Sequence, residues 1–315
     1  TNAKGITLKP IAREVTNSTI TYITMAVSID REQFTAEITV YAPKDKPPQQ
    51  KDAIHAAGAD FWHLAFARDL DDFILHMRAN EPEISTWVFK SSGVAEHIEA
   101  GDKALLENAD DWLAREITLY LKRTLKRLDV SSRSIISLIE PESCFTGTLL
   151  ELVLASDRSY MLDGVFEGSN LPAATIRPTG MNFGPLPMCN GLSRLGTRFL
   201  GNPSFIDTIR DVIGVDLDAE AAEKLGIVTF IPDDIDWKDE VRLAIEERAS
   251  YSTDALTGME ASLRFAGPET LETKIFGRLS AWQNWIFQRP NAVGEGGALN
   301  LFGTGKQAKY DKKRV

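Results

Sequence analysis

One acidic side chain lies at the start of a predicted buried helix, directly after a glycine turn. The segment 144–157 has the sequence CFTGTLLELVLASD, and it follows the apolar run SIISLI at 134–139. Backbone N–H groups in the first turn of a helix have no partners within the helix, and the helix dipole favours negative charge there. Such an amide can stabilise an oxyanion in a transition state. The segment therefore indicates a site with Glu151 as acid or base, and the alternative is a structural carboxylate that the dipole stabilises.

The other reactive side chains form no recognisable group. The chain has only two cysteines, Cys144 and Cys189, which excludes a disulfide framework and indicates a reducing, cytoplasmic compartment. No cysteines and histidines have the spacing of a zinc site, so we expect no metal. The lysines of the Pro-rich segment 43–51 form either a solvated loop or a contact for a phosphate-bearing ligand. The scattered histidines are interpreted as surface or packing residues: His55, His63, His76 and His97.

The composition is that of a globular protein. The chain has 315 residues, of which 43% are hydrophobic and 25% are charged, and its net charge is −10. Acidity disfavours nucleic acid and anionic membrane as partners, although a local basic patch could still bind a phosphate ester. No apolar run is long enough to span a membrane. Because the first residue is Thr1 and not Met, we expect a domain cut from a longer chain or a processed one.

Strands and helices alternate along the chain, which predicts an α/β core. Alternating apolar residues at 22–42 predict a hairpin, and apolar runs at 84–89, 134–139 and 228–231 predict strands. Apolar residues at helical spacing predict helices from about 147 and at about 67–80, 104–128, 189–200, 204–213, 218–225, 237–249, 253–264 and 268–287. We expect a linker or arm at 1–20, the core at 21–250, a helical C-terminal region at 251–288 and an extended tail at 289–315.

Four segments, in this order along the chain, resemble the crotonase (enoyl-CoA hydratase/isomerase) superfamily: Ser91–Val94, Cys144–Asp157, Gly184–Leu195 and Ala219–Val228. The resemblance implies a crotonase-like spiral core with helices at its C-terminal end. It also implies that the backbone N–H groups of Thr148 and Val94 form an oxyanion hole for the thioester oxygen of an acyl-CoA. Glu151 is then the first of the family's two carboxylates.

Two positions depart from the family pattern. The family's glycine-rich turn is reduced to Gly147, and its second carboxylate position is occupied by Gly180. Paired carboxylates with separated pKa values let one pocket perform both acid and base chemistry, and this pair is incomplete. These departures favour a catalytically silent scaffold or dimerisation unit, whereas the retained Glu151 favours an active enzyme.

Longer stretches resemble the C-terminal half of the benzoyl-CoA-dihydrodiol lyases: Leu128–Ser134, Ile275–Phe287 and Arg289–Glu295. This resemblance implies part of a ring-cleaving acyl-CoA lyase that acts on oxygenated, dearomatised benzoyl-CoA and releases formate during aerobic benzoate degradation. It implies an N-terminal crotonase-like half as partner, and no cofactor other than the CoA of the substrate. It assigns no CoA-binding residues in this chain.

Three functional hypotheses therefore remain open from the sequence. The chain is an active part of the lyase, a silent scaffold half of it, or an enzyme of the enoyl-CoA hydratase/isomerase type. Under each of them we expect a homo-oligomer, because the segment 253–287 carries more apolar side chains than one short helical layer hides.

Overall fold

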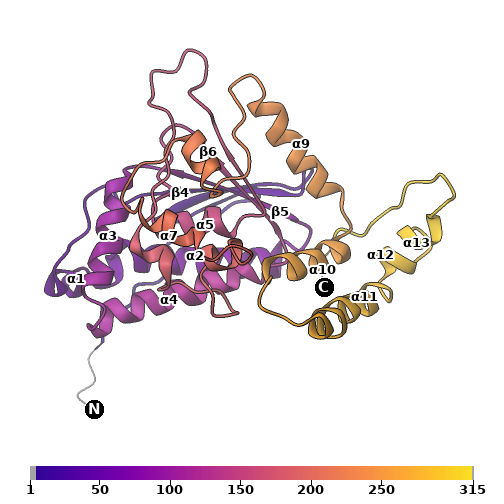
Figure 1. Ribbon diagram of the computed structural model, residues 1–315, viewed down its shortest axis with the longest axis horizontal. Helices are drawn as coiled ribbons and strands as arrows, with labels where there is room; N and C mark the ends of the chain where they lie inside the picture. The colour runs from indigo at the N-terminus through magenta and orange to yellow at the C-terminus, as the bar shows by residue number, and fades with distance from the viewer. Residues whose placement is uncertain (1–4, 314–315) are drawn as a thin grey trace.

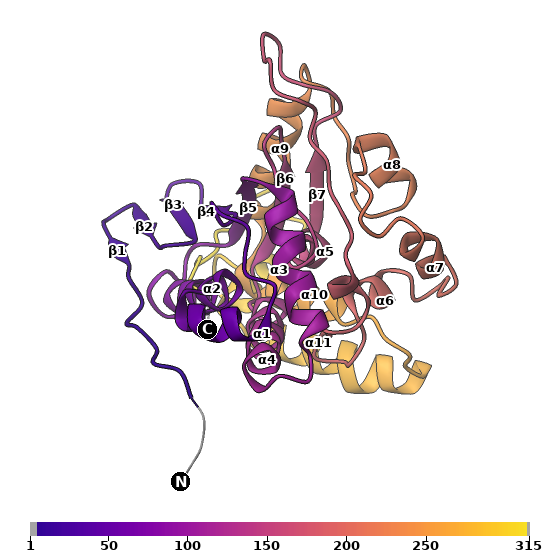
Figure 2. The same cartoon turned by 90° about the vertical axis from the view of Figure 1, so that its left-hand side faces the viewer.

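A mixed sheet of seven strands, arranged in chain order, runs through the computed structural model, which describes residues 5–313 (Figures 1 and 2). The three pairs from β1 to β4 are antiparallel, and the three pairs from β4 to β7 are parallel. The strands are β1 (Glu14–Val15), β2 (Thr19–Thr21), β3 (Met25–Asp30), β4 (Thr35–Tyr41), β5 (Thr86–Ser92), β6 (Ser134–Ile139) and β7 (Arg158–Met161).

Helices make the crossovers that the parallel strands require. The helices before β7 are α1 (Lys51–Ala57), η1 (Gly58–Asp60), α2 (Trp62–Asn80), α3 (Ala95–Glu107), α4 (Trp112–Asp129) and α5 (Leu150–Ala155). After β7 come η2 (Gly180–Phe183), α6 (Arg194–Arg198), α7 (Phe205–Arg210), α8 (Ala219–Lys224), α9 (Trp237–Ser250) and α10 (Thr253–Arg264). The last elements are the π-helix η3 (Thr273–Leu279), α11 (Ser280–Ile286), α12 (Pro290–Val293) and α13 (Ala298–Leu301).

Both faces of the parallel part of the sheet are covered. Trp87 and Phe89 of β5 point into the large core that α2 and α4 complete, while Val88 between them points into a smaller core with Trp237 of α9. Strand β6 is buried along its whole length for the same reason. Continuous apolar runs such as the one at 134–139 are therefore central strands, as the sequence predicts.

Several predicted boundaries are wrong. Residues 14–21, expected in a linker or arm, form β1 and β2 at the edge of the sheet. The single helix expected at 104–128 is two helices, because the Asp111 carboxylate caps α4 by accepting the N–H groups of Leu113 and Ala114. Residues 228–231 form only an isolated bridge from Phe230 to Tyr160. The tail, expected to be extended, contains α12 and α13, and residues 1–4 and 314–315 lie outside the described residues.

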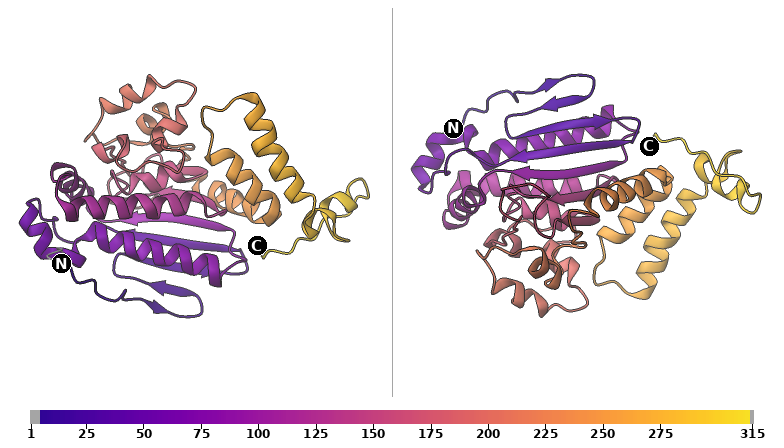
Figure 3. Two further views of the ribbon diagram at one scale, coloured as in Figure 1. Left: turned by 90° about the horizontal axis from the view of Figure 1, so that it is seen from below. Right: turned by 90° about the horizontal axis from the view of Figure 1, so that it is seen from above.

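The C-terminal helices from η3 onward extend to one side of the sheet, beyond α10 (Figures 1 and 3). Helix α10 itself is attached to the core by buried charges. Arg264 Nη2 lies 3.1 Å from Asp157 Oδ2 and 3.2 Å from Glu260 Oε2. Arg248 of α9 lies 3.4 Å from Glu260 Oε1. A buried charge cluster therefore connects α9 and α10 to the end of α5.

The charge cluster makes stability depend on pH. Burial, together with the neighbouring Asp157, raises the pKa of Glu260 to about 8 against the attraction of Arg264. Between the ordinary carboxyl pKa of about 4.3 and about 8, the folded state therefore binds more protons than the unfolded state. We expect the free energy of unfolding to fall as pH rises through this window, by at most about 1.4 kcal/mol per pH unit. Urea denaturation from pH 5 to pH 9 measures this slope.

Glu260→Gln is the control for that measurement, because the amide does not titrate. The variant should show a flatter profile than the wild-type chain over the same pH range. Equal slopes for the two proteins would contradict the assignment to Glu260.

Candidate active site

The turn before α5 brings the predicted site residues into the protein interior. Gly147 has a φ of +47°, which favours glycine, and a Cβ atom there would lie 1.7 Å from Asp102 Oδ2. Every residue of α5 is buried, and Thr148 and Glu151 are 0% and 1% exposed. Gly147 is therefore required because a carboxylate from α3 lies directly against the turn.

The Asp102 carboxylate accepts a hydrogen bond from the Thr148 amide. Thr148 N–H donates to Asp102 Oδ2 at 2.9 Å, and the Thr148 hydroxyl donates to Asp102 Oδ1. The Thr179 hydroxyl donates to the same carboxylate, to Oδ2 at 2.9 Å. An amide that stabilises a substrate oxygen must point at the position of that oxygen. In this chain the Thr148 amide points at Asp102 Oδ2.

A histidine completes the set of groups around Asp102. His63 Nε2 lies 3.0 Å from Asp102 Oδ1, and both side chains are fully buried. The imidazole packs against Phe61 and Trp62, and a Cβ at Gly101 would lie 2.1 Å from its Cε1 atom. His63 is therefore a packed core residue, as the sequence suggests, and it helps to hold the Asp102 carboxylate in place.

Glu151 is held in a buried ionic triad with Arg194 and Asp129. Arg194 Nη1 donates to Glu151 Oε2 at 2.7 Å, and Arg194 Nη2 donates to Asp129 Oδ1 and Oδ2 at 2.9 and 2.8 Å. Asn182 Nδ2 donates to Glu151 Oε1 at 2.7 Å. Burial raises the pKa of Glu151, and the Arg194 charge opposes this. Both carboxylate oxygens of Glu151 are thus engaged by protein donors.

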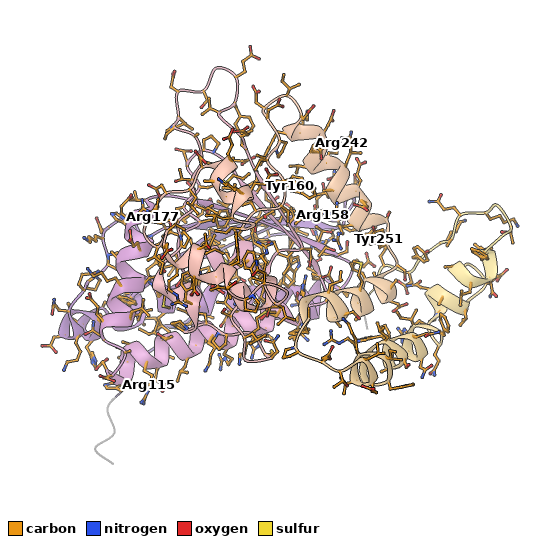
Figure 4. The ribbon with its side chains drawn as sticks, viewed as in Figure 1. Arg115, Arg158, Tyr160, Arg177, Arg242 and Tyr251 are labelled. Carbon is orange, nitrogen blue, oxygen red and sulfur yellow. The ribbon has the colours of Figure 1, made fainter. Side chains whose placement is uncertain are left out.

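The second predicted amide, that of Val94, lies just before α3. Val94 is the residue before the first turn of α3, and its side chain is exposed. Asp102, the partner of Thr148, lies eight residues further along, which is about 12 Å of helix. Arg177 pairs with Glu96 and Glu99 at this end of α3 (Figure 4).

Gly180, at the position of the family's second carboxylate, begins η2. A Cβ there would lie 2.9 Å from Leu106 Cδ1. The neighbouring Thr179 and Asn182 form a capping box, and their side chains bind Asp102 and Glu151, respectively. The segment that would supply the second carboxylate therefore supplies hydrogen-bond donors to the two buried acids.

Sequence reasoning missed Asp102, Asn182 and the role of Arg194. A signal for Asp102 exists, because it follows Ile98 by four residues on α3 and so shares the buried face of that helix. Arg194 stands inside one of the four motif segments, but its partner Asp129 is 65 residues away. No spacing rule links two residues so far apart in the chain.

Three further features bear on cofactors and partners. Within residues 5–313 no group of three or more His, Cys, Asp or Glu side chains could hold a metal ion. Over the same residues, no helix is long and apolar enough to cross a membrane. A pocket of about 530 Å³ lies beside the basic segment, lined by Tyr41, Lys44, Lys46 and Trp62 among others. This pocket places Lys44 and Lys46 where a phosphate-bearing ligand could contact them.

Asp102→Ala should lower the free energy of unfolding by about 3 kcal/mol or more, because it leaves several buried donors without an acceptor. Glu107→Ala, an exposed change on the same helix, should alter it by no more than about 0.5 kcal/mol. Urea denaturation at neutral pH measures both. A loss below about 1 kcal/mol for Asp102→Ala would show that the carboxylate is not needed there.

The chain is 49% identical over 313 residues to a benzoyl-CoA-dihydrodiol lyase of Aromatoleum evansii. The alignment includes 99% of this chain and 56% of the relative, so the chain spans little more than half the length of that protein. No known protein-family model matches the chain.

Solved structures with a similar fold include enoyl-CoA hydratases. The enzyme from Geobacillus kaustophilus HTA426 has a TM-score of 0.63 at 17% identity, covering 92% of this chain and 97% of that one. The enoyl-CoA hydratase/isomerase from Marinobacter aquaeolei has a TM-score of 0.62 at 16% identity, covering 91% and 98%. At such low identity these structures establish the fold alone. The chain therefore has the crotonase fold, and it is related along nearly its whole length to part of a benzoyl-CoA-dihydrodiol lyase.

Proposed function

We propose that the chain is the silent half of a two-unit crotonase-type lyase. The complete lyase opens the ring of an oxygenated, dearomatised benzoyl-CoA and releases formate in the cytoplasm, with no cofactor besides the CoA of its substrate. An N-terminal crotonase-like half carries the chemistry. The relative's name supports the reaction class, and the relative's additional length supports a second unit.

The observation that carries the silent role is the Asp102 carboxylate on the Thr148 amide. Enolate chemistry on a thioester develops negative charge on the carbonyl oxygen, and a fixed carboxylate at the same amide repels that charge. Moving Asp102 away from the amide would also leave the buried hydroxyl groups of Thr148 and Thr179 without their acceptor. This contact therefore opposes both substrate binding and catalysis at this position.

The state of Glu151 supports the same proposal. A general acid or base must reach the proton that it transfers, directly or through one water. The Glu151 oxygens instead face Arg194 and Asn182 at 2.7 Å each. With Gly180 in the second position, the family's pair of carboxylates that divide acid and base roles is incomplete. An independent hydratase or isomerase activity is therefore disfavoured.

The test is Glu151→Gln in the complete two-unit lyase, because glutamine keeps the shape and can still accept from Arg194. If this half is silent, the turnover of benzoyl-CoA dihydrodiol should stay within about threefold of wild type. A loss of about a hundredfold or more, the scale expected for a general acid or base, would overturn the proposal. Steady-state kinetics on protein whose assembly has been checked by gel filtration gives the answer.

We further propose that the C-terminal helices pack against a second copy of the chain. Large apolar side chains are exposed along these elements and the turns beside them, and large exposed apolar patches mark association sites. They are Leu271, Ile275, Phe276, Leu279, Phe287, Val293, Leu299 and Phe302. Symmetric homo-oligomers are the commonest outcome of such association.

Phe276→Asp should shift the chain to a smaller species, because Phe276 is 73% exposed and a buried aspartate would disrupt the contact. Leu243→Asp on α9, where the leucine is 54% exposed, is the matched control and should leave the mass unchanged. Light scattering coupled to gel filtration measures the mass. A wild-type chain that remains monomeric at high concentration would contradict the proposal.

A further inference from the structure

A groove of about 600 Å³ lies between helix α4 and the N-terminal arm, which is residues 5–13 ahead of β1. The floor of the groove consists of three buried side chains of α2 and α4, Leu64, Leu113 and Ile117. Ten residues line the groove, and none of them takes part in the contacts around Asp102 or belongs to the C-terminal helices. The groove is therefore a separate feature of the surface.

The walls of the groove present apolar side chains to solvent. Leu119 of α4 is 39% exposed, and Leu8 of the arm is 55% exposed. Trp112 and Tyr120 are half-buried beside them. Trp112 and Leu119 are seven residues apart, which is about two turns of helix, so they lie on one face of α4. The apolar stripe of α4 thus continues from the core onto the surface, where the chain leaves it uncovered.

The arm borders this groove without filling it. Lys9 of the arm pairs with Asp60 at 2.6 Å, and both side chains are about two-thirds exposed. Arg68 Nη2 donates to the Lys9 carbonyl oxygen at 2.6 Å. Ile6 and Ile11 are the arm residues that pack, partly buried, against the large core. Exposed ion pairs contribute little to stability, so these contacts set the path of the arm but leave the apolar groove open.

We propose that the groove receives an apolar segment of the N-terminal crotonase-like half. This inference rests on the proposed function, in which that half precedes this chain, and on the relative's length, of which this chain covers 56%. The peptide link between the halves then reaches the described part of the fold at Gly5, next to Ile6 in the groove wall. A short link holds the preceding unit at an effective concentration on the order of millimolar.

The size of the groove favours a connected partner over a free one. A stable interface between separate proteins has about 20–30 residues on each side, whereas ten residues line this groove. A small apolar contact can hold a unit that is already linked, because its association is then intramolecular. A second copy of the chain is expected at the C-terminal helices, which lie at the opposite end of the molecule from the start of α4 (Figure 1).

Hydroxyl-radical labelling read by mass spectrometry tests the proposal in the complete two-unit lyase and in this chain alone. The labelling rates of Leu8, Trp112 and Leu119 should be about threefold or more lower in the complete lyase, because interface cores exclude water. Leu243, 54% exposed on α9, is the control and should be labelled equally in both. Unchanged rates at the groove would overturn the proposal. Protection that appears in the chain alone at high concentration would place a second copy there and would overturn it too.

Substitutions test the same contact through stability. Leu119→Asp should lower the unfolding temperature of this unit by about 4 °C more in the complete lyase than in the chain alone, because the carboxylate is buried only in the complete lyase. Leu243→Asp should have the same effect in both proteins to within about 1 °C. Equal effects in both proteins for Leu119→Asp and for the independent variant Leu8→Asp would contradict the proposal. The turnover of Glu151→Gln tests the silent role separately, since it does not depend on what the groove contains.

Discussion

The buried Arg194 guanidinium is the contact on which the arrangement of this half of the molecule depends. It joins the last residue of α4, Asp129, to Glu151 in the first turn of α5, and it is itself the first residue of α6. Burying three charges costs desolvation energy that only close, well-oriented pairing offsets. Moving any of the three helices away would leave buried charge unpaired, so the triad favours the relative position that the helices have.

The same physical principle explains why the expected catalytic groups are not free. In an active oxyanion hole the amide N–H points at the place where negative charge develops on the substrate oxygen. Here the Thr148 amide faces the Asp102 carboxylate, and Glu151 faces Arg194. Acid and amide therefore contribute to stability in the folded chain. Both residues are part of the protein interior, since Thr148 is 0% and Glu151 1% exposed.

The C-terminal third of the chain has two regions, and buried ion pairs hold only the first of them against the core. Helix α10 is held by Glu260 and Arg264, which reach the end of α5 and the start of β6. Beyond Arg264 the chain extends away from the sheet, and its large apolar side chains are exposed (Figure 3). The first region completes the core of one unit, and the second presents a surface suited to another unit.

The sequence by itself determined the α/β class, the crotonase resemblance and the central strands, because an apolar run such as 134–139 carries its own local signal. It also located Glu151 and Thr148 at a helix start, since the glycine turn and the helix are adjacent in the chain. It did not reveal that Asp111 divides one predicted helix into two, because a capping carboxylate looks like any surface acid.

Only the tertiary structure decided which groups the predicted site residues contact. Asp102 and Thr148 are 46 residues apart, and Asp129 and Arg194 are 65 residues apart. Pairing of buried charges depends on distances in space of a few ångströms, and residue spacing in the chain carries no information about contacts made across such separations. The residue types therefore predicted a possible active site, whereas the partners of these residues became visible only in the folded chain.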